Sequence, residues 1–363
     1  MLERETDVLV IGAGQAGLSA AFHLRRRGFE PGSGFTVLDA DAAPGGAWAH
    51  RPRTLTMAAV HGFYELPGMP LPQYPEQRPA REVLPDYFAA YERANDLRVV
   101  RPARVSTVRE AGDGGPGTGG RLVAESDAGR WTARALINAT GTWTRPFLPY
   151  YPGVEAFRGR QLHSSGYTGP EEFAGRRVLV VGGGASAVQI LAETAAVART
   201  LWVTRRPPVF RDEAFTPELG RSVVAMVARR VREGLPPASV VSVTGLPPTP
   251  ALRRARELGA LHRLPMFERL TEDGAVWPDG RTERFDAIVW ATGFRPETAH
   301  LAPLGLRTAG GGIRLDGTAA ADDPRIHLVG YGPSASTVGA NRAGRAAAAA
   351  VDRLLATQRV ASA

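Results

Sequence analysis

The stretch DVLVIGAGQAG, residues 7–17, decides the fold of this chain. A run of aliphatic residues ends at Gly12, and a pattern of small and apolar residues typical of a helix begins soon after it. Gly12 permits a tight turn, Gly14 allows a pyrophosphate to approach the backbone, and Gly17 allows the helix to pack closely against the strand. The N-terminus of such a helix faces the phosphates. The stretch therefore predicts a strand, a turn and a helix that bind a dinucleotide.

A second apolar run, FTVLD at residues 35–39, completes this first unit. It ends at Asp39, where a carboxylate can accept hydrogen bonds from an adenosine ribose. The spacing from the glycine turn is longer than the usual ~20 residues, and the inserted PGSG at residues 31–34 explains the difference. We therefore expect Asp39 to bind the nucleotide of the first unit.

The same order of elements recurs at residues 176–204, where RRVLVVGGG leads into a helical stretch and then into TLWVT. The second turn places Gly182, Gly184 and Ala187 at the three motif positions, and alanine is tolerated at the last of them. The chain therefore contains two dinucleotide-binding units.

Two arginines, Arg205 and Arg206, follow the second unit at the place where a nucleotide 2′-phosphate would lie. Because a planar guanidinium can bind phosphate through two hydrogen bonds, the pair favours NADP over NAD. The alternative is that both are ordinary surface residues of an arginine-rich chain.

Two further strands, one on each side of the second unit, end in the tripeptide Ala-Thr-Gly. The strand ALIN runs into Thr140 and Gly141, and the strand DAIVW runs into Thr292 and Gly293. Paired exits of this kind indicate that the second unit is inserted into the first domain, with both chain crossings at the junction.

The composition excludes several kinds of chemistry. The 363 residues include no cysteine, which excludes disulfides, thiolate metal sites, cysteine nucleophiles and dithiol relays. No metal-binding spacing such as HExxH is present, so we expect no metal. All 44 basic residues are arginine, a bias typical of a GC-rich genome, and we expect no nucleic-acid partner despite the net charge of +8. No apolar run reaches the ~18 residues of a membrane span, so we expect a cytoplasmic protein without a membrane partner.

The segment FRGRQLHSSGY lies directly before the second unit and carries Phe157, Gly159, His163 and Tyr167. In position and spacing it matches the pattern F-x-G-x-x-x-H-x-x-x-Y/F of the class B flavin-dependent monooxygenases, and the chain resembles that family over essentially its whole length. The resemblance implies that the first unit binds FAD and the second NADPH. His163 would hydrogen-bond at the domain junction near NADP or brace the linker there.

Other segments carry the same resemblance. Gly46 and Trp48 belong to a GG-x-W flavin segment, and Gly330 and Tyr331 stand where disulfide reductases usually have Gly-Asp. These residues, with the two Thr-Gly exits, are the remaining cofactor residues that the resemblance implies. Compact bacterial arsenic-resistance-type members are similar in detail, and residues 55–72 are similar to the plant YUCCA-type enzymes, which act on indole-3-pyruvate.

We therefore expect an α/β fold with two Rossmann-like dinucleotide-binding domains, the second inserted in the first. The FAD-binding domain would comprise residues 1–150 and 286–363, and the NADPH-binding domain residues 151–285. A long alanine-rich helix from about Ser336 would complete the first domain.

The resemblance also implies a reaction. NADPH would reduce FAD, O2 would form a C4a-(hydro)peroxyflavin, and a small-molecule substrate would take one oxygen atom by heteroatom oxygenation or by Baeyer-Villiger or decarboxylative chemistry. One alternative is an NADPH oxidase or flavin-dependent reductase that passes electrons to O2 or a quinone. Another is a nucleotide-binding protein without catalysis. Family members are often dimers, so a homodimer is possible.

One catalytic candidate departs from the family pattern. Many flavin-containing monooxygenases carry an asparagine near the flavin C4a, and Ala58 takes that position here. His61 lies nearby in the sequence and is our candidate for the missing hydrogen bond, although an isolated histidine is more often structural. His262 and His300 belong to no recognisable group of residues, and we expect them to be surface or packing residues.

Overall fold

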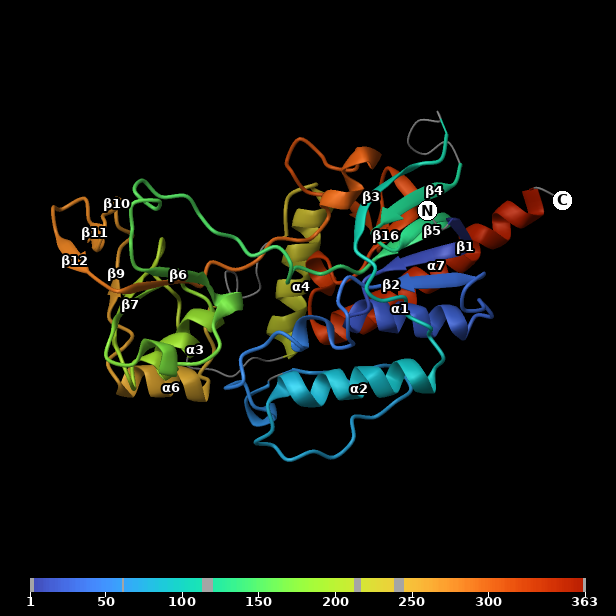
Figure 1. The fold of residues 1–363 in the computed structure, drawn as a ribbon. Coiled ribbons are helices and arrows are strands. Elements are labelled where there is room, and N and C mark those ends of the chain that lie inside the picture. Colours follow the sequence, from blue (N-terminus) through green and yellow to red (C-terminus); the bar gives the residue numbers. More distant parts are fainter. Residues whose placement is uncertain (1–2, 61, 113–119, 212–216, 238–244, 362–363) are drawn as a thin grey trace.

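The computed structural model describes residues 3–60, 62–112, 120–211, 217–237 and 245–361. Its strands form two sheets that contain parallel strands, with a small antiparallel sheet beside the second. Figure 1 shows these two sheets in separate bodies, with both chain termini on the body that contains the first sheet. The predicted α/β fold, with a second unit inserted in the first, is confirmed.

The first sheet has the strand order β14-β15-β16-β5-β1-β2. Its parallel strands are β1 (Glu3–Ile11), β2 (Phe35–Leu38), β5 (Gly129–Asn138) and β16 (Asp323–Leu328). Antiparallel pairs extend it through β3 (Val105–Glu110), β4 (Leu122–Ser126), β14 (Leu315–Asp316) and β15 (Ala319–Ala320). The four parallel strands therefore end at one edge, which is where open α/β sheets bind their ligands.

Both faces of the first sheet are buried. Val8 and Val10 of β1 contribute to one core cluster, and Leu9 and Ile11 contribute to the other. The helices on the first side are α1 (Gln15–Arg25), α2 (Ala80–Ala94) and α7 (Thr337–Ala361). Because successive side chains of a strand point to opposite faces, burial on both sides requires the continuous apolar run that the sequence shows.

The second sheet is parallel throughout, in the order β6-β13-β7-β8-β9. Its strands are β6 (Arg160–His163), β7 (Arg177–Val181), β8 (Arg199–Val203), β9 (Arg263–Leu264) and β13 (Ala287–Trp290). Helices α3 (Ala185–Thr194) and α6 (Pro250–Glu257) pack on one face. The other face meets an aromatic cluster and the antiparallel strands β10 (Arg269–Leu270), β11 (Gly274–Val276) and β12 (Thr282–Arg284).

Two segments differ from the domain division that we expected from the sequence. β13 pairs with β6 and β7, so residues 287–290 belong to the second sheet, although the division at residue 286 assigned them to the first domain. Helix α4 (Pro217–Arg232) lies within the expected insert, but its Val231 packs into a core cluster of the first sheet. A short apolar run fits either sheet, and tertiary packing alone decides which one it joins.

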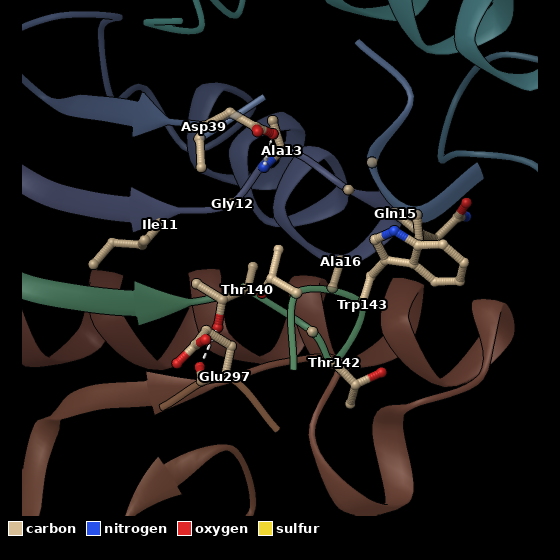
Figure 2. Close-up of a pocket in the computed structure, with 18 of the residues that line it drawn as sticks. Ile11, Gly12, Ala13, Gln15, Ala16, Asp39, Thr140, Thr142, Trp143 and Glu297 are labelled. Atoms are coloured by element: carbon tan, nitrogen blue, oxygen red, sulfur yellow. Dashed lines mark hydrogen bonds between the residues drawn. The ribbon is translucent and has the colours of Figure 1, made fainter. Parts of the chain in front are cut away.

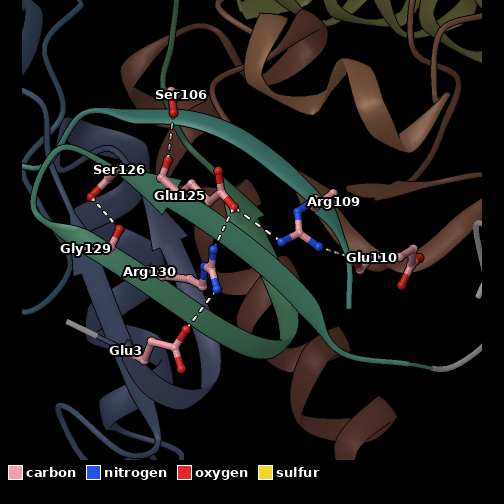
Figure 3. A network of polar contacts seen from close by, with 8 residues as sticks. All are labelled: Glu3, Ser106, Arg109, Glu110, Glu125, Ser126, Gly129 and Arg130. Carbon is pink, nitrogen blue, oxygen red and sulfur yellow. Dashed lines mark hydrogen bonds and ion pairs between the residues drawn. The ribbon is translucent and has the colours of Figure 1, made fainter. Parts of the chain in front are cut away.

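The hairpin of β3 and β4 is joined to the rest of the first sheet by a network of charged side chains (Figure 3). The Glu125 carboxylate pairs with Arg109 of β3 and with Arg130 of β5, and Arg130 also pairs with Glu3 of β1. Such exposed pairs contribute little stability individually. They do connect four neighbouring strands, β3, β4, β5 and β1. The beginning of β3 forms part of the rim of the cleft described below.

The turns after β1 and β7 lie directly under neighbouring strands. A Cβ atom built on Gly12 would lie 2.6 Å from the Ala139 carbonyl oxygen, and one on Gly182 would lie 2.1 Å from the Ala291 carbonyl oxygen. Both glycines also have a positive φ, 99° and 137° respectively. Only glycine meets both requirements without strain, so each turn can lie close to the strand that ends beside it.

Replacement of Gly17 by alanine should destabilise the protein, because the new Cβ would lie 1.8 Å from the Gly12 carbonyl oxygen. Forcing α1 away from β1 should lower the free energy of unfolding by about 1–3 kcal/mol or more. Gly14→Ala is the matched control, since a Cβ there meets nothing within 4 Å and φ is −78°. Urea unfolding of the flavin-free chain measures both variants, and equal stability of the two would contradict this packing.

Buried histidines should make stability depend on pH. His327 of β16 is only 1% exposed, and burial lowers its pKa from 6.5 to about 4. As pH falls below 6.5, the unfolded chain binds a proton that folded His327 does not accept until about pH 4. Stability is therefore complete above pH 6.5 and is lost as pH falls towards 4.

Between pH 7.5 and pH 5.0, the free energy of unfolding of His327→Asn should fall by about 2 kcal/mol less than that of the wild type. Asparagine keeps a polar atom for the Thr318 hydroxyl, which lies 2.8 Å from His327 Nδ1. The exposed His262, replaced in the same way, serves as the control. Denaturant unfolding at the two pH values tests this. The same pH dependence in the wild type and both variants would contradict the prediction, because it would show that folded His327 binds a proton as readily as the unfolded chain.

Candidate dinucleotide sites

A cleft of about 500 Å³ lies at the C-terminal edge of the first sheet. Figure 2 shows the turn after β1 on one side of it and the chain that leaves β5 on the other. Of the residues predicted to bind a cofactor, the following line this cleft: Gly12, Gly14, Asp39, Gly46, Trp48, Thr140, Gly141 and Gly330. The structure therefore brings together residues from four regions of the chain that the sequence connects only through motifs.

The beginning of α1 is left open towards a ligand. Gly14 stands at the N-cap position in an extended conformation, and no described side chain caps the helix. The first amides of an α-helix have no partner within the helix and carry partial positive charge. The geometry fits a phosphate group above Gly14, where a Cβ atom would meet only open space.

Asp39 connects the end of β2 to the glycine turn. Its Oδ2 accepts a hydrogen bond from the Ala13 amide at 2.7 Å, and its Oδ1 accepts one from the Asp41 amide at 2.9 Å. Burial raises the pKa of Asp39, while these amides and the Arg101 guanidinium, 3.7 Å away, act in the opposite direction. The carboxylate thus holds the turn in place and also faces the cleft. Its binding to a ribose stays a prediction.

The GG-x-W segment crosses the beginning of α1. A Cβ atom on Gly46 would lie 3.0 Å from the Gly14 Cα, and Gly45 and Gly46 both have a positive φ. Trp48 follows in the short 3-10 helix η1 (Gly46–Trp48). These glycines let the segment lie against the turn, so that it forms one wall of the cleft.

The second unit repeats the geometry of the first. Gly184 stands at the N-cap of α3 in an extended conformation, and among the described residues no side chain caps that helix. Ala187 is fully buried against the sheet. Arg205 and Arg206 follow β8 at the same edge and are exposed, so their guanidinium groups are accessible to a ligand.

The two units are joined by chain segments that hydrogen-bond to each other. The Phe147 amide donates to the Gly293 carbonyl and the Glu297 amide donates to the Gly141 carbonyl, both at 2.9 Å. The hydroxyls of Thr140 and Thr292 reinforce these pairs by donating to the Glu297 and Phe147 carbonyls. The two predicted Thr-Gly exits therefore form a paired crossing between the units.

His163 braces this crossing. Its Nδ1 accepts a hydrogen bond from the Ser165 amide at 3.1 Å, so Nε2 carries the proton and donates to the Gly293 carbonyl at 2.9 Å. Burial lowers the pKa of His163, which favours this neutral form. The structure thus gives His163 a bracing contact on the linker, one of the two roles considered, and its contact with NADP is untested.

The rest of the family motif has packing contacts. Phe157 lies in a core cluster with Phe285, and a Cβ on Gly159 would lie 2.6 Å from the Asp286 carbonyl oxygen. The Tyr167 hydroxyl donates to Glu193 of α3 at 2.9 Å. The motif therefore fixes the strand that leads into the second unit.

Two residues predicted to bind the cofactor of the first unit do not line the cleft. Gly17 packs α1 against the turn rather than facing the cleft. Tyr331 is buried in a core cluster, where its hydroxyl accepts a hydrogen bond from the Ile313 amide. His61 lies outside the described residues.

His300 is a cleft residue that the sequence did not indicate. It is buried, and its Nε2 lies 2.7 Å from Asn138 Oδ1, while the Asn138 amide nitrogen donates to the Thr140 hydroxyl at 3.0 Å. Burial lowers the pKa of His300 to about 4, so the ring is neutral at pH 7. We expected a surface or packing residue, and that expectation did not predict that His300 lines the cleft. The only sequence signal was the asparagine two residues before Thr140.

Comparison with known proteins identifies the family to which the chain belongs. A family model described as pyridine nucleotide-disulphide oxidoreductase matches residues 6–333. A solved flavin-containing monooxygenase from Stenotrophomonas maltophilia is 37% identical with a TM-score of 0.81, and the match covers 97% of this chain and 99% of that one. The curated indole-3-pyruvate monooxygenase YUCCA1 of Oryza sativa subsp. japonica is 29% identical over 343 residues, which cover 85% of this chain and 81% of that protein.

A bacillithiol disulfide reductase from Bacillus cereus is also similar, with 18% identity, a TM-score of 0.67 and coverage of 96% of this chain and 99% of that one. At that identity the likeness shows only the fold, and a chain without cysteine has no dithiol to exchange. Together, the two glycine-turn units and these relatives show that the chain belongs to the pyridine nucleotide-disulphide oxidoreductase family, as a class B flavin-dependent monooxygenase that uses FAD and NAD(P)H.

Proposed function

We propose that the cleft of the first unit holds FAD, that the second unit holds NADPH, and that the enzyme oxygenates a small molecule. One observation carries this assignment: α1 and α3, which no described side chain caps, each begin behind a glycine turn, and the chain segments that join the two units are hydrogen-bonded to each other. Each open helix end can accept a pyrophosphate. The paired crossing holds the two sites in one arrangement, as hydride transfer between two bound rings requires.

Bound FAD supplies the redox chemistry, and the protein positions it, tunes it and excludes water. The residues of the first cleft that would hold FAD are the turn around Gly14, Asp39, the segment at Gly46 and the exit at Thr140. The first residues of α7 also line the cleft. The Ser336 hydroxyl caps this helix by accepting a hydrogen bond from the Gly339 amide. We expect the amides of that helix end to stabilise negative charge on the reduced flavin.

The substrate class follows from the relatives. Their names include an indole-3-pyruvate monooxygenase and a Baeyer-Villiger monooxygenase of Streptomyces coelicolor. These names support a substrate that presents a carbonyl carbon to the flavin, and oxygenation at a soft heteroatom stays a prediction. A homodimer, a cytoplasmic location and the absence of nucleic-acid partners stay predictions. In the part of the chain that the structure describes, no helix combines the length and apolar character needed to cross a bilayer.

The purified chain should be yellow, and its flavin should lose colour when NADPH is added without oxygen. Under air, a true substrate should lower the ratio of hydrogen peroxide formed to NADPH consumed, because the oxygen is transferred to it. A peroxide yield that equals NADPH consumption with every compound of a carbonyl and thioether panel would favour the oxidase. A colourless protein that takes up no added FAD would reject both enzymes.

The double replacement of Arg205 and Arg206 by glutamine should raise KM for NADPH about 10- to 100-fold, because a charged hydrogen bond to the 2′-phosphate is worth roughly 1.5–3 kcal/mol. KM for NADH should change by less than about twofold, since NADH lacks that phosphate. The matched control is Arg199→Gln, at the other end of β8 and also exposed. An equal rise in KM for NADPH and NADH would mean that Arg205 and Arg206 do not bind the 2′-phosphate.

A further inference from the structure

Arg51 occupies an unusual position in the wall of the first cleft. Its guanidinium carbon lies 4.8 Å from the centre of the Trp143 ring and 5.6 Å from the centre of the Trp48 ring. Trp143 in turn stacks on Phe294 of the other linker, with ring centres 5.1 Å apart. Aromatic contacts thus fix the guanidinium group where the cleft meets the crossing between the units.

This cation has no counter-charge among the residues that the structure describes. Among the described residues, no hydrogen bond or ion pair of the Arg51 side chain is present, and its Nε is buried without a partner. Burial lowers the pKa of Arg51, and no carboxylate acts against that shift. The acidic residues that line the cleft already have partners, since Asp39 pairs with Arg101, Asp41 with His50 and Glu297 with Arg145. Arg51 is half-buried and its Nε is enclosed. A partly desolvated charge without a partner is unfavourable, so the site favours an anion.

The position of the segment indicates which anion. Gly46 lies against Gly14 at the open end of α1, and the Arg51 amide donates to the Trp48 carbonyl at 3.2 Å, which folds Arg51 back onto the same segment. Contacts of the rings with the guanidinium leave in-plane N–H donors for a phosphate, which a guanidinium can bind through two parallel hydrogen bonds. Two sources of positive potential, the helix end and Arg51, therefore act on one cleft.

We propose that Arg51 binds the pyrophosphate of FAD and supplies the charge that the amides of α1 only partly provide. The inference rests on the proposed function, because it takes FAD as the ligand of the first cleft. It goes beyond that function in assigning a residue outside the glycine motif to the phosphates. The competing position for the same cation is beside the flavin ring, where it would stabilise negative charge on the reduced form.

Two fragments of FAD separate these positions. ADP carries the pyrophosphate without the flavin ring, and riboflavin carries the ring without any phosphate. In the full-length chain stripped of flavin, Arg51→Gln should raise the Kd of FAD and of ADP about 10- to 100-fold, because a charged hydrogen bond is lost. The Kd of riboflavin, measured by competition, should stay within about twofold because no phosphate is involved.

Arg53→Gln is the matched control, since Arg53 lies two residues away and is exposed. It should bind FAD, ADP and riboflavin like the wild type. Arg51→Lys keeps the charge but not the planar pair of donors, so its Kd for ADP should lie between those of the wild type and Arg51→Gln. This variant also maintains the test if the glutamine variant does not fold.

Unchanged affinity of Arg51→Gln for ADP would overturn the proposal, as would equal losses for ADP and riboflavin. A lower flavin midpoint potential with normal ADP affinity would place Arg51 at the flavin ring instead, which also overturns it. Failure of the wild type to bind FAD is a different result, since it would reject the proposed function itself.

Discussion

The close approach of a strand exit to a glycine turn is the constraint on which both sites depend. The Ala139 carbonyl lies over Gly12 in the first unit, and the Ala291 carbonyl lies over Gly182 in the second. Any side chain at either glycine would collide with that carbonyl and push the neighbouring strand away. Because the approach is possible, the exit from the neighbouring strand and the beginning of the helix face each other, and the ligand site lies between them.

The same exits determine how the two units are connected. Residues 140–147 and 292–297 pair through backbone amides, and threonine hydroxyls and the neutral ring of His163 add further hydrogen bonds to this crossing. A crossing made of paired backbone is stiffer than two independent linkers, because each segment limits the conformations of the other. Electron transfer between two separately bound cofactors needs such a fixed arrangement, so the crossing is as much a part of the site as the glycine turns.

Charge in the first cleft is distributed in a way that the motifs do not show. Asp39 is used partly to hold the turn, through its hydrogen bond to the Ala13 amide. Arg51 contacts two indole rings and has no counter-charge among the described residues. His300 is neutral because burial lowers its pKa. In the described part of the chain, the cleft therefore combines helix-end amides without a side-chain cap with a cation that has no protein counter-charge, an arrangement suited to an anionic cofactor.

The sequence by itself determined the two units, their order, the insertion and the class of cofactor, because glycine spacing and apolar runs are local consequences of backbone geometry. Tertiary structure alone decided that residues 287–290 join the second sheet and that Val231 of α4 packs on the first. It also placed His300 in the cleft and Tyr331 in the core. These positions depend on contacts between residues far apart in the chain, where packing and burial select among partners that local patterns leave equivalent.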